Sequence, residues 1–253
     1  MTARLTLAFV LFATLADLAG CAMERDIAGG SDAVRGRPYF QVWQNDGGDW
    51  YFDFKAANHE IILQSEGYGA RSAALNGVLS TLDNGLDARR YEVVQAGNGQ
   101  WFVRLNSVNG RVIGWSETYT TRQGAERGMQ AVLANVGEYQ DWLANRTGAR
   151  FDVFRGNDGR YYFNLHAANG EIILRSQGYT TEESALSATF SVAENGIDRA
   201  RYEVNASADG GAYFNLEAAN GQIIGTSEVY VSTSNAQRAV DGVIALLPSV
   251  ELL

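Results

Sequence analysis

One twelve-residue pattern occurs four times in this chain and constrains its fold more than any other feature. The four copies align without gaps and end at Ser65, Ser116, Ser176 and Ser227. Successive closing serines lie 51, 60 and 51 residues apart, so copies one and three, like copies two and four, are separated by 111 residues. A unit of about fifty residues has therefore been doubled, and the doublet has been doubled again.

The hydrophobic pattern within each unit predicts three strands and a helix. The second strand of the first unit, 50–55, alternates between aromatic and other residues, as a strand with two different faces does. Asn-Gly follows this strand in units two to four and predicts a tight hairpin, because a type I′ turn needs positive φ. The first unit has Asn58-His59 there, so we expect strain in its turn. The third strand, such as 61–64, begins with two adjacent apolar residues and is expected to be the most enclosed.

A helix is expected to complete each unit. Three units have a Ser or Thr N-cap two residues after a shared tyrosine, and the first has Ala70. We therefore predict an α+β fold of four βββα repeats that form two domains, with antiparallel sheets and helices packed on the face that carries Phe52 and Phe54. The expected boundaries are a leader over 1–20, a lipidated cysteine and tether over 21–37, a first domain over 38–136 (repeats 38–87 and 88–136), a linker over 137–148, and a second domain over 149–253 (repeats 149–198 and 199–247).

The repeated motif resembles that of the YegP-like family, formerly known as DUF1508. The third unit carries it almost throughout, from Tyr161 to Ser176 and again at Tyr179. The resemblance covers about 38–247, nearly all of the chain after the tether. It implies that two βββα units form one compact domain. It implies no catalytic residue, substrate or cofactor.

The N-terminal residues have the pattern of a bacterial lipoprotein signal. Arg4 precedes the apolar run 5–16, and Leu-Ala-Gly-Cys then ends at Cys21. The run is shorter than the roughly 20 residues that a membrane-spanning helix needs. The tetrad resembles the lipobox, which implies acylation of the Cys21 thiol and cleavage before it. Ala22 follows the cysteine where an inner-membrane retention signal has Asp, which implies the outer membrane. An ordinary secretory signal with an incidental cysteine is the alternative.

Composition limits the partners. The formal net charge of −9 means that nucleic acids are repelled, and none is expected as a partner. Arginine clusters at 89–90 and 199–201 keep a nucleic-acid or stress-related role as a second alternative. The single cysteine excludes an intramolecular disulfide.

No catalytic, cofactor or metal site is predicted. Of the two histidines, His59 lies in a hairpin turn and His166 on an exposed polar register, so we interpret both as surface residues. The Asn-Asp-Gly segments 45–47 and 157–159 are interpreted as turns rather than calcium loops. The shared serine is expected to close a turn with its hydroxyl.

The best candidate binding face is the outer register of the strands. Its aromatic residues are Trp43, Tyr51, Phe102, Phe154, Tyr162 and Tyr213. Aromatic rings beside planar polar groups suit carbohydrate or peptide recognition. We nevertheless favour burial of this face between domains or repeats, with Tyr139, Trp142 and Leu143 of the central insert in the seam.

The leading hypothesis is a non-enzymatic binding or scaffolding module, anchored to the membrane by its lipid and facing a protein or glycan partner in the envelope. The first alternative is a hydrolase of envelope glycans that uses carboxylates brought together by the fold.

Overall fold

A computed structural model describes residues 36–252 of the chain and contains the four predicted repeats. The first domain comprises β1 (Tyr39–Gln44), β2 (Trp50–Lys55), β3 (Ile61–Gln64), α1 (Arg71–Asn84), the 3-10 turn η2 (Ala88–Arg90), β4 (Tyr91–Gln95), β5 (Trp101–Asn106), β6 (Val112–Tyr119) and α2 (Arg122–Asn145). The second comprises β7 (Arg150–Arg155), β8 (Tyr161–His166), β9 (Ile172–Arg175), α3 (Glu182–Asn195), η3 (Arg199–Arg201), β10 (Tyr202–Ala206), β11 (Ala212–Glu217), β12 (Ile223–Thr226), α4 (Thr233–Leu246) and η4 (Leu247–Ser249). The leader, Cys21 and most of the tether lie outside the described residues.

Each domain is built on one antiparallel six-stranded sheet. The strand orders are β1-β2-β3-β6-β5-β4 and β10-β11-β12-β9-β8-β7, so the third strands of the two repeats pair at the centre. At that centre a Cβ on Gly114 would lie 2.6 Å from the Gln64 carbonyl oxygen, and one on Gly225 would lie 2.4 Å from Leu174 Cδ2. Odd repeats therefore carry leucine where even repeats carry glycine, and the two kinds of repeat are complementary.

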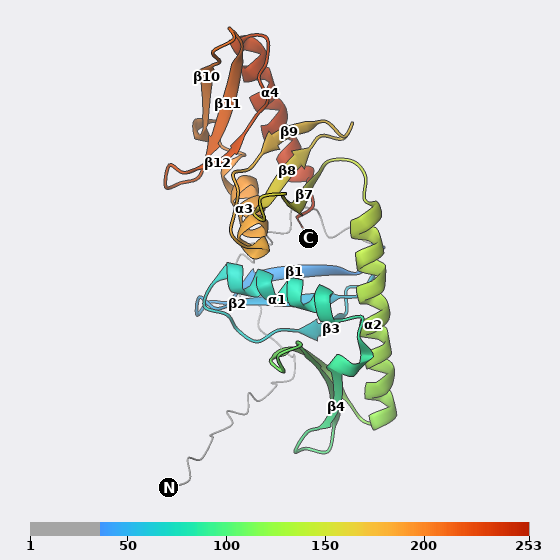
Figure 1. The fold of residues 1–253 in the computed structure, drawn as a ribbon. Coiled ribbons are helices and arrows are strands. Elements are labelled where there is room, and N and C mark those ends of the chain that lie inside the picture. The colour runs from blue at the N-terminus through green and yellow to red at the C-terminus, as the bar shows by residue number, and fades with distance from the viewer. Residues whose placement is uncertain (1–35, 253) are drawn as a thin grey trace.

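The helices pack on one face of each sheet, as predicted. Phe52 and Phe54 are fully buried there, and a Cβ on Gly77 of α1 would lie 2.5 Å from the Phe52 ring. The expectation that the third strand is enclosed on both faces is wrong. Ile61 and Ile223 remain 41% and 45% exposed, because no helix within residues 36–252 covers the other face of the sheet (Figure 1).

The repeated small residues have the structural roles expected of them. The Ser65 hydroxyl accepts a hydrogen bond from the Phe52 amide (2.8 Å) and donates one to the Glu66 carbonyl (2.9 Å). The other three closing serines do the same, and Thr121, Thr181 and Ser232 cap their helices. The hairpins form where expected, but they are not type I′ turns, because the asparagine has negative φ and only the next residue has positive φ. That residue is His59 in the first repeat, with a φ of 69°, so its turn carries the predicted strain.

The expected linker over 137–148 is wrong for most of its length, because α2 continues to Asn145 alongside the first domain (Figure 1). The extension is helical because Tyr139 packs into the core of the first domain, with its ring 5.1 Å from that of Phe40 and 6.2 Å from that of Phe54. Tyr139 is therefore not in a seam between domains.

The two domains meet through α1 and α3, which contact each other. In Figure 1, α3 lies directly above α1. Arg71, at the start of α1, forms an ion pair with Glu194 at the end of α3. The repeat separation of 111 residues makes Glu182 the counterpart of Arg71, and Asp83 the counterpart of Glu194. At this second end the charges are alike. Partial burial raises the pKa of Glu182, and the Asp83 and Glu183 carboxylates raise it further.

Within residues 36–252, no helix combines the length and apolar character that crossing a membrane requires.

The leucine–glycine contact at the sheet centre can be tested with Gly114→Ala. The added methyl group would meet backbone on β3, so we expect a loss of about 1–3 kcal/mol in the free energy of unfolding. Gly242→Ala is the matched control, because nothing lies within 4 Å of its added Cβ in α4, and alanine there should stabilise by about 0.5–1 kcal/mol. Urea unfolding measures both. Equal stabilities for the two variants would contradict the close approach.

The like-charged end of the α1–α3 contact predicts that Glu182→Arg is more stable than Glu183→Arg. Both variants change the net charge equally in the first turn of α3, but only the first places a cation at the position equivalent to Arg71, near Asp83. The difference should be at most about 1 kcal/mol, because the groups are exposed. Thermal unfolding at low salt and at about 1 M NaCl checks it, since screening should remove the difference.

Candidate binding site on the open sheet faces

The face of each sheet opposite the helices is open to solvent among the described residues. The domains meet through helices, so neither domain covers the other's outer strand register. Phe154 is 43% exposed, and the other five candidate aromatic residues are partly exposed. The favoured expectation that this face is buried is therefore wrong.

The structure brings four of the six candidate residues together, in two pairs. Trp43 lies opposite Tyr51 on β1 and β2, and their rings stack with centroids 4.8 Å apart. Phe154 and Tyr162 form the equivalent pair on β7 and β8, at 5.9 Å. The remaining two candidates, Phe102 and Tyr213, lie far from these pairs across the sheets. Phe102 lies opposite Val94 and Tyr213 opposite Asn205, so neither has an aromatic partner.

The paired tyrosines are held by the turns around them. The Tyr162 hydroxyl donates a hydrogen bond to Asp158 Oδ2 (2.7 Å), which lowers the pKa of the Asp158 carboxyl and raises that of Tyr162. A Cβ on Gly156 or Gly178 would lie 2.8 Å from the Tyr162 side chain. In the first domain a Cβ on Gly67 would meet Tyr51 at the same distance. The rings therefore have little freedom to rotate, and binding would cost little side-chain entropy.

A row of polar side chains crosses the first sheet beside the Trp43–Tyr51 pair. Paired positions on adjacent strands place in this row Gln41, Asp53, Gln64, Trp115, Arg104 and Glu92. Asp53 is only 5% exposed and accepts hydrogen bonds from Trp43 Nε1 (3.0 Å) and Gln64 Nε2 (2.9 Å). Trp115 is half-buried at the centre of the row. Sequence reasoning missed it, although its place directly before the buried Ser116 puts it on the outer register of β6.

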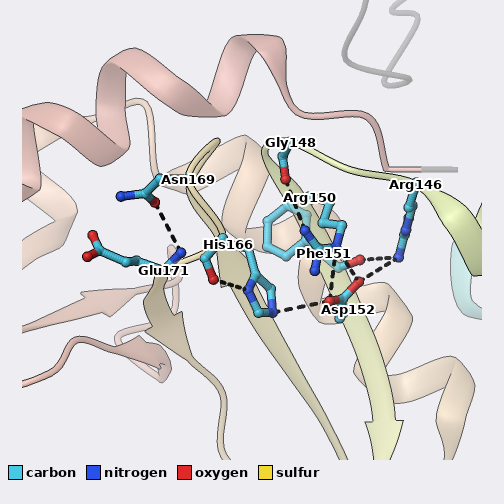
Figure 2. Close-up of polar contacts among 9 residues, drawn as sticks. Arg146, Gly148, Arg150, Phe151, Asp152, His166, Asn169 and Glu171 are labelled. Atoms are coloured by element: carbon cyan, nitrogen blue, oxygen red, sulfur yellow. Dashed lines mark hydrogen bonds and ion pairs between the residues drawn. The ribbon is translucent and has the colours of Figure 1, made fainter.

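The corresponding row of the second sheet ends in a charged cluster, shown in Figure 2. His166 Nε2 lies 3.1 Å from Asp152 Oδ2, and Arg150 Nε donates to both oxygens of Asp152 at 3.1 Å. Arg146 Nη2 reaches Asp152 Oδ1 at 3.3 Å. The cluster was also missed, although the pairing of Arg150 with His166 on adjacent strands follows from the predicted hairpin.

His166 differs from its interpretation as a surface residue. It lies on the predicted outer register, but its side chain is only 12% exposed. Its Nδ1 lies 3.0 Å from the Gly170 carbonyl oxygen, while Nε2 faces Asp152 (Figure 2). Both ring nitrogens are therefore directed at oxygen atoms of the chain itself.

Other groups that sequence reasoning considered for chemistry also have local partners. His59 Nδ1 lies 2.9 Å from the Tyr39 hydroxyl. The Asn-Asp-Gly segments close hairpins, as in the hydrogen bond from the Gly159 amide to the Gly156 carbonyl. Across residues 36–252, no three His, Cys, Asp or Glu side chains are placed to hold a metal ion.

Comparison with known proteins identifies the repeats. The model of the family described as "Domain of unknown function (DUF1508)" matches residues 45–92, 96–139, 157–203 and 207–252, well over half of the chain. Each match begins after the first strand of a predicted repeat, so the family's repeat boundaries lie one strand later along the chain than the boundaries predicted from the sequence.

The similar proteins have the length of one pair of repeats. The UPF0339 protein PA0329 of Pseudomonas aeruginosa is 41% identical over 104 residues, which are 41% of this chain and 94% of that protein. The UPF0339 protein YegP of Escherichia coli is 39% identical over 95 residues, 38% of this chain and 86% of that protein. The solution NMR structure of E. coli yegP gives a TM-score of 0.39 at 35% identity, over 42% of this chain and 93% of that one. The chain thus belongs to the DUF1508 family, and its four repeats each match the family model.

Proposed function

We propose that the protein is a non-enzymatic binding module of the bacterial cell envelope that binds glycan chains on the open faces of its sheets. One observation carries the proposal: each domain presents a stacked aromatic pair, fixed by its turns, beside a row of polar side chains on an uncovered face.

A glycan suits this face better than other polymers. The apolar side of a sugar ring packs on an aromatic ring, and its hydroxyls hydrogen-bond to planar amide, carboxylate and guanidinium groups. Gln41 and Asn164, both partly exposed, supply such groups next to the two pairs. A polyanion such as nucleic acid would be opposed by the net charge of −9.

The occupied polar groups support binding rather than hydrolysis. A glycosidase needs one carboxylic acid that donates a proton and a second carboxylate at a defined distance. Asp53 instead accepts two hydrogen bonds within the protein, and Asp152 is held between two arginines and His166. The four shared serines are likewise bound to backbone groups on both sides.

The envelope location rests on the sequence before the first domain. Cys21 completes the lipobox-like tetrad, so the proposal includes a diacylglycerol anchor on Cys21 and an outer-membrane address, facing the periplasm or the surface.

Removal of the aromatic pairs should abolish glycan binding. We expect Trp43→Ala/Tyr51→Ala and Phe154→Ala/Tyr162→Ala each to weaken binding to one site by about tenfold or more, since a lost ring contact is worth about 1–1.5 kcal/mol. Co-sedimentation with peptidoglycan sacculi and calorimetry with soluble glycan fragments measure this, on the full chain with Cys21→Ser to keep it out of membranes.

Val231→Ala is the control, because Val231 is 84% exposed and lies outside the open faces. It should bind as the parent does. Binding that is unchanged in both double variants, or a ligand that proves to be a peptide, would overturn the glycan assignment, and glycan turnover would overturn the non-enzymatic one.

The anchor is tested separately by Cys21→Ser in the bacterium. The parent chain should incorporate labelled palmitate and fractionate with the outer membrane, because thiol acylation adds chains whose burial stabilises membrane binding. The variant should lose both properties. Membrane association of the variant at the level of the parent would refute lipid anchoring at Cys21.

A further inference from the structure

A cavity of about 350 Å³ lies where the chain passes from the first domain to the second. Its walls come from the end of α2, the start of β7 and the segment that follows α4, and they include Trp142, Arg146, Arg150, Ser249 and Glu251. It is therefore formed by both domains together, and it is separate from the stacked aromatic pairs.

Positive charge gathers around this cavity in an otherwise acidic chain. Arg146 and Arg150 line it, and their side chains are only 15% and 24% exposed. Arg37 lies over the Trp142 ring at 3.5 Å and pairs with Glu251. Among the described residues, these three arginines pair with two carboxylates, Asp152 and Glu251.

Each lining arginine also has guanidinium N–H groups for which no acceptor is found among the described residues. Arg146 uses Nη2 for Asp152 and the Phe151 carbonyl, and its buried Nε has no hydrogen-bond partner. Arg150 uses Nε for Asp152 and Nη1 for the Gly148 carbonyl, which leaves Nη2. Figure 2 shows the two guanidinium groups approaching Asp152 from different directions. A buried donor without an acceptor is costly, so an anion placed here would recover that cost.

The geometry points to a phosphate group as the ligand, and we propose this cavity as a phosphate-binding site at the domain junction. The N–H groups without an acceptor come from two arginines rather than from one guanidinium fork, which is what a planar carboxylate matches best. A tetrahedral phosphate directs its oxygens to donors on both sides at once. The cavity volume leaves room for a small group attached to the phosphate, against the Trp142 ring.

Two sources supply this chemistry: a free phosphate or phosphomonoester, and a phospholipid headgroup. The lipid source rests on the proposed anchor, because Arg37 lies at the end of the proposed tether. Either source would hold Arg146 of the first domain and Arg150 of the second together, and thus stiffen the junction.

Calorimetry of the full-length Cys21→Ser chain with inorganic phosphate tests the site. We expect one phosphate per chain, and at least about tenfold weaker binding in Arg150→Gln, since this variant loses a charge-assisted hydrogen bond to the anion. Arg155→Gln is the matched control, because Arg155 lies on the same strand but donates to the Gly159 carbonyl instead. It should bind phosphate as the parent does.

Ser249→Trp keeps the test informative if Arg150→Gln does not fold, because it fills the cavity and leaves the arginines in place. It should abolish phosphate binding while the circular dichroism spectrum stays unchanged. If phosphatidylglycerol vesicles compete with phosphate for the site and neutral diacylglycerol dispersions do not, the source is a lipid headgroup. If the vesicles do not compete, the source is a free phosphate or phosphomonoester. The proposal would be overturned if the parent chain does not bind phosphate, or if Arg150→Gln and Ser249→Trp both bind it as tightly as the parent does.

Discussion

The pairing of third strands at the centre of each sheet is the contact on which the rest of the structure depends. A single βββα unit would leave its third strand as an exposed edge, with unpaired backbone groups. In the doublet, β3 pairs with β6, and the Leu63 side chain packs where Gly114 has none. A leucine at both positions would overlap, and a glycine at both would leave a gap. The complementary pair thus explains why odd and even repeats differ and why they occur in twos.

This central pairing also decides which surfaces remain free. It aligns the two repeats so that both helices lie on one face, where Phe52 and Phe54 are buried. Contact between the domains then uses the helix layers, through α1 and α3. The outer face of each sheet is left over, and its residues are the ones that differ most between the domains. Gln41 and Lys55 correspond to Asp152 and His166, while on the buried face Phe52 of β2 is kept as Phe163 in β8 and Phe54 is replaced by another apolar residue, Leu165.

Features that depend on neighbours along the chain were predictable from the sequence. The repeats, hairpins, helix caps and strand alternation follow from local periodicity and turn chemistry, and His59 was expected to strain its turn. Features that depend on partners far along the chain were not. Tyr139 lies in a helix rather than a linker because Phe40, about a hundred residues earlier, buries it. Exposure of the aromatic face likewise depended on how the domains meet. The Asp152 cluster required the strand pairing and the end of α2 together.

The arrangement of layers limits how two open faces can act together. Each face lies on the side of its sheet away from the helices, and the α1–α3 contact lies between the two sheets. A single short ligand cannot reach both faces at once, so the duplication does not raise the affinity for one such ligand through local concentration. It instead lets one chain hold two ligands. Because the aromatic pairs are alike and the adjacent charged groups differ, the two ligands share an aromatic-stacking group and differ in the groups beside it. If the chain is anchored in the envelope as proposed, duplication of this kind favours bridging between two partners over tighter binding of one.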